Sequence, residues 1–300
     1  MHVHILDLNF MALDHAVAAF AVEGPDGWAL VETGPGSTLP ALVEGLAALG
    51  VHPAELAGVL VTHIHLDHAG AAGWLARQGV PIHVHPVGAP HLVDPSRLIA
   101  SATRIYGDAM DRLWGNILPA PDDRVIAVED GATVAVAGLT FRAIATPGHA
   151  KHHHAWRVGD ALFTGDAGGV RLPGSRLVAV PAVPPEFDPD AWRATMDRLV
   201  AECDALPTTT LYLTHFGAVA DGRWHFERLR EELSDVVAFI GARQGEGLER
   251  DAILQLYVEW SRARALEAGV DAAELARFEA ANPFGVSVDG VLRWLGRRAG

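Results

Sequence analysis

The sequence is poor in the features that mark exported or membrane-spanning proteins. Cys203 is the single cysteine, so no disulfide can form within the chain and nothing indicates an oxidising compartment. We expect this cysteine to pack as a small apolar residue rather than to act as a catalytic thiol. No apolar run approaches the about 20 residues needed to cross a bilayer, and the first residues, MHVHILDLNF, do not resemble a secretory signal. We therefore expect a cytoplasmic protein that does not enter a membrane.

Positive charge is also scarce. The chain has 23 Lys and Arg residues against 37 Asp and Glu residues, a formal net charge of −14, and its basic residues are scattered along the sequence. This balance repels a phosphate backbone, so we expect no nucleic-acid partner. Of the 300 residues, 50% are hydrophobic and 20% are charged, which is typical of a folded globular protein. The partner we expect is a small-molecule substrate.

Short β-prone runs alternate with helical segments along most of the chain. Three β-prone runs separated by turn residues fill 2–34, and a helix is expected over 37–49. An apolar strand over 57–62 follows, and a second group of strands begins at about 124. The last strand that the pattern predicts lies in TTTLYLTHFG. This alternation predicts a layered α/β architecture with two similar halves.

Two helical segments stand apart from this alternation. Apolar residues recur at helical spacing from Asp94 to about Trp114, so we expect a helical insertion over about 88–118 that covers one end of the sheet as a lid would. Beyond residue 222 the pattern is helical to the end. We therefore expect a catalytic domain over 1–222 and a C-terminal helical extension over 223–300. The sequence leaves open whether the chain forms a homodimer.

Polar residues with metal-binding side chains follow several of the apolar strands. Strand ends in layered α/β folds face a common edge, where ligands bind. Here they offer five imidazoles and two carboxylates, donors that suit zinc, iron or manganese and are too many for one tetrahedral ion. We therefore expect two divalent metal ions, with zinc as the first choice and manganese or iron as alternatives. The seven residues are His63, His65, Asp67 and His68 in THIHLDHAG, His149 in IATPGHA, Asp166 in ALFTGDA, and His215 in LYLTHFG.

The motif HIHLDH, together with His149, Asp166 and His215, resembles the full ligand set of the metallo-β-lactamase-fold hydrolases. The resemblance covers about residues 1–220. The resemblance implies a four-layer αββα sandwich. The tail ANPFGVSVDGVLRWLGRR is similar to the C-terminal helices of glyoxalase-like members, whereas Glu32 in VETGPGS stands where the family usually has Asp. The resemblance implies one metal site of His63, His65 and His149, a second of Asp67, His68 and His215, and a bridge between them through Asp166.

The chemistry that this resemblance implies is hydrolysis. Two cations can hold a bridging hydroxide that attacks an ester, a lactone or a thioester, and Asp67 could orient it or carry its proton to the leaving group. No Gly-x-Ser-x-Gly elbow is present. A β-lactamase is disfavoured because no export signal is seen and Asp166 is present. The alternatives are a persulfide dioxygenase-like oxidoreductase with one iron on His63, His149 and Asp166, a phosphodiesterase, and a non-catalytic binding scaffold.

Several further residues are assigned weaker roles. His153 matches the second histidine of the family pattern GHxxxH and could brace the site, while His152 and His154 are expected on the opposite face. For most other histidines we expect only packing or solvent exposure. Candidates for the substrate pocket are Arg97, Arg104, Tyr106 and Arg171 as polar contacts, and Trp114, Phe187 and Trp294 as apolar ones. Surface positions fit the arginines equally well, and core packing is favoured for the three apolar candidates.

Overall fold

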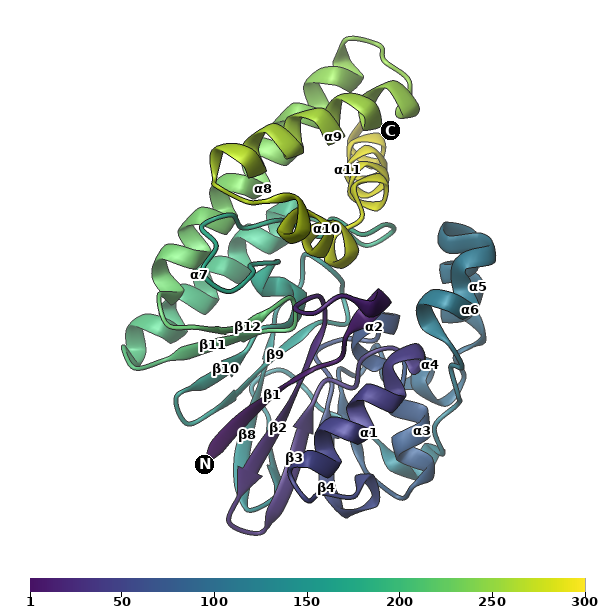
Figure 1. Ribbon diagram of the computed structural model, residues 1–300, viewed down its shortest axis with the longest axis vertical. Helices are drawn as coiled ribbons and strands as arrows, with labels where there is room; N and C mark the ends of the chain where they lie inside the picture. The colour runs from purple at the N-terminus through teal and green to yellow at the C-terminus, as the bar shows by residue number, and fades with distance from the viewer. Residues whose placement is uncertain (300) are drawn as a thin grey trace.

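The computed structural model, which describes residues 1–299, has two six-stranded β-sheets that face each other, with helices on the outside of both (Figure 1). The first sheet has the order β1-β2-β3-β4-β5-β6 and the second β12-β11-β10-β9-β8-β7. The first sheet comprises β1 His2–Asp7, β2 Ala18–Gly24, β3 Gly27–Val31, β4 Leu56–Leu60, β5 Ile82–Val84 and β6 Val125–Ala127. The second comprises β7 Thr133–Val136, β8 Leu139–Ala145, β9 His154–Val158, β10 Ala161–Phe163, β11 Thr210–Leu213 and β12 Gly217–Val219.

Large apolar side chains fill the space between the two sheets. Phe20 in β2, Phe141 in β8 and Trp156 in β9 are fully buried there. The indole Nε1 of Trp156 donates a hydrogen bond of 2.9 Å to the carbonyl of Val61, so this core residue also ties the second sheet to the end of β4. Strand β2 is buried at five successive positions because both of its faces are covered. The sheets are therefore fixed against each other close to the end of β4.

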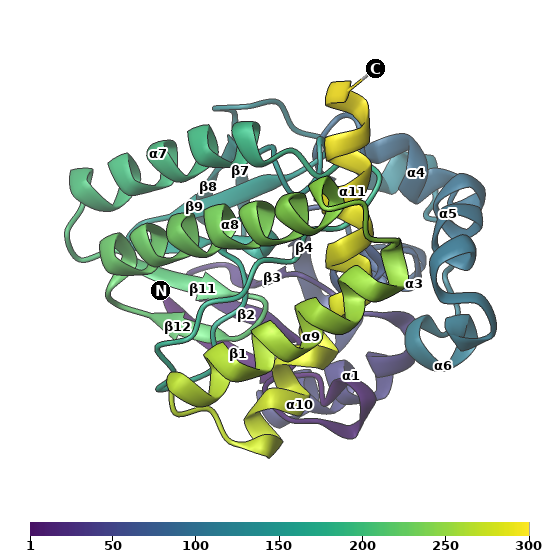
Figure 2. The same cartoon turned by 90° about the horizontal axis from the view of Figure 1, so that it is seen from above.

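Helices cover the outer faces and complete the four layers. Helices α1 Leu39–Ala48, α2 Leu66–Ala69 and α3 Ala72–Arg77 lie against the first sheet, and α7 Pro189–Ala205 and α8 Gly222–Gly245 lie against the second (Figures 1 and 2). Asp188 caps the start of α7, because its carboxylate accepts from the backbone N–H groups of Asp190 and Ala191. The αββα sandwich expected from the sequence is thus the fold of this chain.

Two further groups of helices lie beyond one end of the sandwich. The insertion consists of α4 Ala89–Val93, α5 Ser96–Tyr106 and α6 Met110–Trp114, and the C-terminal region continues from α8 into α9 Arg250–Glu267, α10 Ala272–Ala281 and α11 Phe284–Ala299. In Figures 1 and 2 the insertion stands on one side of this end and helices α9 to α11 on the other. Apolar residues of α8, α9 and α11 join the core that α7 forms with the second sheet. The helical tail is therefore packed onto the sandwich, and the division at residue 222 stays a prediction.

One strand was missed by the sequence pattern. β12 pairs antiparallel with β11 and follows it after three residues, whereas β11 was expected to be the last strand. Its three residues are too few to show a period of two. Within residues 1–299, every helix is too short or too polar to cross a membrane.

Candidate metal centre

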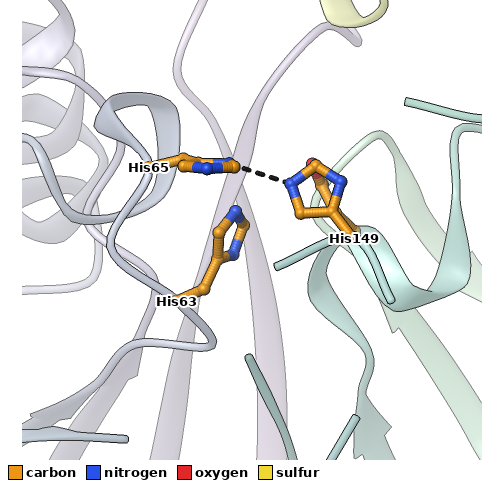
Figure 3. Close-up of side chains that lie close together, drawn as sticks. His63, His65 and His149 are labelled. Carbon is orange, nitrogen blue, oxygen red and sulfur yellow. Dashed lines mark hydrogen bonds and ion pairs between the residues drawn. The ribbon is translucent and has the colours of Figure 1, made fainter. Parts of the chain in front are cut away.

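All seven predicted ligand residues lie at one end of the sandwich, in segments that follow strands. His63 follows β4, His149 follows β8, Asp166 lies in a short 3₁₀ helix after β10, and His215 follows β11. Figure 3 shows His63 and His65 on one segment and His149 on another, with their rings pointing toward one another. Nδ1 of His65 lies 2.8 Å from Nε2 of His149. The donor atoms form two groups, each within 4.8 Å: His63, His65, His149 and Asp166, and then Asp67, His68 and His215.

Hydrogen bonds to backbone carbonyls set the tautomers of two of these imidazoles. His149 donates from Nδ1 to the carbonyl of Pro181 at 2.8 Å, and His215 donates from Nδ1 to the carbonyl of Ala16 at 2.7 Å. A carbonyl oxygen only accepts, so Nδ1 of each ring carries a proton, and Nε2, the atom that a metal ion would bind, faces the centre. This is the usual arrangement of histidines that bind metals.

Glu32 sets the orientation of two more imidazoles. Its Oε1 accepts from Nδ1 of His68 at 2.9 Å and from the hydroxyls of Thr62 at 2.5 Å and Thr214 at 3.2 Å, while Oε2 accepts from the Thr62 N–H at 3.1 Å. Because the Thr62 hydroxyl donates to Glu32, it accepts from Nδ1 of His63, 3.1 Å away. The Glu32 backbone has φ +63°, a left-handed conformation that costs a non-glycine residue about 1 to 2 kcal/mol. A glutamate therefore supports two imidazoles at the position where the family usually has Asp.

Several buried donor atoms at the centre have no hydrogen-bond partner within residues 1–299. They are Nε2 of His63, His68 and His215 and Oδ1 of Asp166. Each such atom costs about 1 to 3 kcal/mol unless something binds it. Borderline nitrogen and oxygen donors, held with lone pairs toward a common point, match the coordination preferences of zinc, manganese and iron. The residues present therefore fit divalent metal ions.

Asp166 lies between the two groups. Its Oδ1 is 3.1 Å from Nε2 of His68 and 3.2 Å from Nε2 of His215, and its Oδ2 is 3.2 Å from Nε2 of His149. Asp67 approaches the second group only, with Oδ2 3.5 Å from Nε2 of His215. One carboxylate thus offers an oxygen to each group of donors, and the other serves one group.

The electrostatics differ between the two groups. In the first, burial lowers the pKa of His65 to about 3 and that of His63 well below its ordinary value. In the second, burial opposes protonation, but Asp166 and its neighbouring carboxylates outweigh it, raise the pKa of His215 to about 9 and hold the pKa of His68 well above the usual value. The second group therefore attracts positive charge strongly, as a cation site must.

Comparison with known proteins places this arrangement in a family. Residues 13–215 match the metallo-beta-lactamase superfamily. The chain belongs to that superfamily. A metallo-beta-lactamase fold-containing protein of Sulfurisphaera tokodaii is 29% identical over 206 residues, which are 66% of this chain and 76% of that protein. The crystal structure of an archaeal superfamily protein from Sulfolobus tokodaii has a TM-score of 0.66 at 19% identity and covers 97% of this chain and 98% of its own.

A relative in the superfamily that is named for its activity aligns over a shorter region. The hydroxyacylglutathione hydrolase of Pseudomonas entomophila is 36% identical over 137 residues, 44% of this chain. The alignment spans 40% of the length of that hydrolase. The recognition of the superfamily and its fold from HIHLDH and the later residues is confirmed.

The superfamily motif extends into residues that brace the centre. Nδ1 of His153 lies 2.6 Å from the Thr146 hydroxyl, and its Nε2 accepts from the Ala167 N–H at 3.3 Å. Gly148 has φ +135°, and a Cβ there would lie 2.4 Å from Trp192. The bracing role of His153 stays a prediction, and the turn before His149 requires glycine.

The structure corrects the expectation for the neighbouring histidines. His152 does not lie on a face opposite the centre: its ring packs 5.5 Å from that of His65, and Nε2 is 3.5 Å from a carboxylate oxygen of Glu186. His154 does turn away, into a buried contact with His85 at 4.5 Å between ring centroids. The sequence predicts that His152 to His154 alternate between two faces, but a turn before β9 interrupts this alternation.

A cavity of about 820 Å³ opens directly onto the metal centre, and Asp67 and Asp166 form part of its wall. Of the predicted pocket residues, Arg97, Tyr106 and Trp114 line it. The others lie elsewhere: Arg104 is exposed, Arg171 pairs with Asp221 at 2.7 Å, and Phe187 and Trp294 pack in the core of the second sheet.

No pattern in the sequence predicts two other walls of the cavity. They come from the loop before β2, with Phe10 and Leu13, and from the helices α10 and α11, with Ala280 and Val286. These apolar residues have no local pattern that distinguishes a cavity wall from a core position.

Proposed function

We propose that this chain is a metal-dependent hydrolase that holds two divalent cations and cleaves an ester, a lactone or a thioester. The observation that carries the proposal is the position of Asp166, which turns one carboxylate oxygen toward each histidine group. A carboxylate placed in this way suits a pair of adjacent ions. Membership in the superfamily and the likeness to a hydroxyacylglutathione hydrolase support the same reaction class.

The chemistry of the centre divides between ions and protein. Two bound cations would lower the pKa of a water toward about 7 and stabilise the negative charge that develops on an attacked carbonyl. Asp67 lines the cavity and its side chain is 20% exposed, against 4% for Asp166. Burial opposes its ionisation, but His68 and His215 outweigh burial and lower the pKa of Asp67 to about 2. We assign to this carboxylate the orientation of the attacking water, from which it accepts a hydrogen bond.

A nucleophile from the protein is not needed in this proposal. Cys203 lies in α7, away from the cavity, and packs beside Gly222. Burial raises the pKa of the Cys203 thiol, and a thiol in that state is a poor nucleophile. Water is therefore the nucleophile we assign.

Metal analysis combined with activity tests the proposal. The protein, purified without added metal, is analysed for zinc, manganese and iron and then assayed with an aryl ester, a lactone and an acyl thioester. We expect two ions per chain, mainly zinc, and hydrolysis that disappears on chelation and returns with zinc. The variant His215→Ala should lose one ion and most of the activity, whereas His52→Ala, at an exposed residue that is not among the seven ligands, should keep both.

Other results would point to other functions. One iron per chain, with oxygen uptake in the presence of a persulfide, would replace the proposal by a dioxygenase. Two ions with cleavage of a phosphodiester but of no carbonyl substrate would replace it by a phosphodiesterase. Fewer than one ion per chain, with no activity after metal is added, would leave a binding scaffold.

A further inference from the structure

The cavity above the metal centre has walls of distinct character. One wall belongs to α5 and α6 of the insertion, one to α10 and α11, and the centre itself forms the floor with His65, Asp67 and Asp166. In Figures 1 and 2 the insertion and the C-terminal helices stand on either side of this end of the sandwich. A volume of about 820 Å³ falls within the range of sites that enclose a whole organic ligand. The molecule that reaches the metals is therefore surrounded by both helical segments.

Most of the wall is apolar, and the apolar surface continues to the outside. Leu98 and Ala102 of α5 face the cavity, as do Ala280 and Val286 on the opposite side. Three of the exposed large apolar residues of the chain also line it: Met11 at 46%, Val87 at 51% and Ile105 at 37% exposure. Exposed apolar residues that converge on a single cavity mark a binding site. The body of the substrate is therefore hydrophobic.

The carboxylates on the C-terminal side of the cavity already have partners within the protein. Asp289 accepts from Arg250 at 2.8 Å, and Glu279 accepts from Arg262 at 2.9 Å. Glu186 accepts from the Lys151 N–H at 3.0 Å and lies beside His152. On this side each charged group of the wall therefore has a partner within the protein.

Two arginines of the insertion, by contrast, line the cavity without a partner in the described part of the chain. Arg97 in α5 and Arg112 in α6 line the cavity, and within residues 1–299 no carboxylate or carbonyl binds either guanidinium. Fifteen other arginines of this acidic chain have a carboxylate within 4.0 Å, as the pairs of Arg250 and Arg262 illustrate. Two cationic side chains without a partner, placed against an apolar cavity, are suited to bind an anion through charge-assisted hydrogen bonds.

We propose that the substrate is an amphipathic ester or thioester, with an apolar body that fills the cavity and an anionic group, a carboxylate or a phosphate, that Arg97 and Arg112 bind. The inference rests on the proposed hydrolase function and narrows its substrate class. The anionic group is separate from the carbonyl that is cleaved, because the arginines belong to the insertion and the reacting carbonyl lies at the metal centre.

The test uses thioesters that differ only in charge. The zinc-loaded protein is assayed with octanoyl thioesters of mercaptopropionate, mercaptoethyl phosphate and the neutral mercaptopropionamide, and with octanedioyl and octanoyl thioesters of the neutral thiol. We expect kcat/KM for an anionic member to exceed that of its neutral partner by at least about tenfold. The double variant Arg97→Gln, Arg112→Gln should abolish this preference by raising KM for the anionic thioesters. The carboxylate and phosphate series identify which anion is preferred.

A matched control distinguishes binding of the anion by Arg97 and Arg112 from an effect of the net charge of the protein. Arg104→Gln removes an exposed arginine from the same helix as Arg97 but outside the cavity, and it should leave the preference intact. Hydrolysis of all members without a preference for charge would overturn the inference and leave the hydrolase proposal standing. A preference that the double variant retains would also overturn it.

A binding measurement covers the case in which no thioester is cleaved, which would count against the hydrolase proposal itself. Calorimetry then compares dodecyl phosphate and dodecanoate with dodecanol. For the wild type, we expect the anions to bind at least about tenfold more tightly than the alcohol. For the double variant, we expect this difference in affinity to disappear. Equal affinities, or a preference unchanged by the two substitutions, would refute it.

Discussion

Replacement of Glu32 by glutamine tests whether one buried carboxylate holds the metal centre together. The side chain is fully buried and accepts four hydrogen bonds, from His68, Thr214 and both donors of Thr62. Glutamine keeps the shape but has one acceptor oxygen instead of two. If that oxygen takes the place of Oε1, the amide nitrogen faces the Thr62 N–H, and two donors then point at each other.

The size of the effect follows from these contacts. Hydrogen bonds to a charged group contribute about 1.5 to 3 kcal/mol, and a buried donor left without an acceptor costs about 1 to 3 kcal/mol. We therefore expect Glu32→Gln to lower the free energy of unfolding by about 2 to 3 kcal/mol. Because His68 would also donate to a neutral oxygen, its Nε2 becomes a weaker ligand, and changes of this kind lower metal affinity by about 10- to 100-fold.

Two measurements separate these effects. Urea unfolding of the metal-free protein gives the stability, and zinc titration against a competing chelator gives the affinity. Glu23→Gln, the same substitution at an exposed position of β2, is the matched control and should change neither. Glu32→Asp keeps the charge but shortens the side chain by one methylene, so it tests the effect of side-chain length alone. A zinc affinity of Glu32→Gln within threefold of the wild type would refute the reasoning.

Three further results are expected. Asp67→Asn should lower kcat by at least about 100-fold while the fold, followed by circular dichroism, stays intact; an unchanged kcat with two bound ions would remove the role assigned to Asp67. Gly148→Ala should cost about 1 to 3 kcal/mol of stability, because its Cβ would lie 2.4 Å from Trp192, and urea unfolding at the wild-type midpoint would contradict this. Since Asp166 and Asp67 raise the pKa of His215 to about 9, zinc must displace a proton from this ring at pH 7, and its affinity should increase with pH up to about 9. Calorimetry in buffers of different ionisation enthalpy measures that release, and heats independent of buffer would exclude it.

Local patterns in the sequence predicted a layered α/β fold and the gathering of the seven polar residues, whereas the four-layer sandwich was implied by the resemblance of the motif to the family. The end of a strand can be recognised from adjacent residues, because an apolar run followed by His or Asp places the polar side chain at the edge of the sheet. The contact between His65 and His149 joins residues that are 84 positions apart in the sequence, yet each was found from its own strand.

Other features depend on distant parts of the chain and left no local pattern. The role of Glu32 arises from Thr214, 182 positions away, and the Glu186 carboxylate beside His152 belongs to a loop outside the motif. The pairing of Arg171 with Asp221 likewise decides whether an arginine faces the substrate or the surface. Such choices follow from tertiary packing, which a period of hydrophobic residues does not encode.

Different elements of the fold supply the candidate metal ligands and the walls of the cavity, and this separation affects how the substrate preference of the chain can change in evolution. The metal-binding side chains come from segments at strand ends, whereas the apolar and cationic walls come from the insertion, the loop before β2 and the last two helices. A mutation in α5 or α10 can therefore lengthen, shorten or recharge the cavity without moving a donor atom. Natural variation and laboratory recombination can exchange these helices between relatives while the reactive centre is inherited unchanged, which is one physical route by which a single fold acquires many substrates.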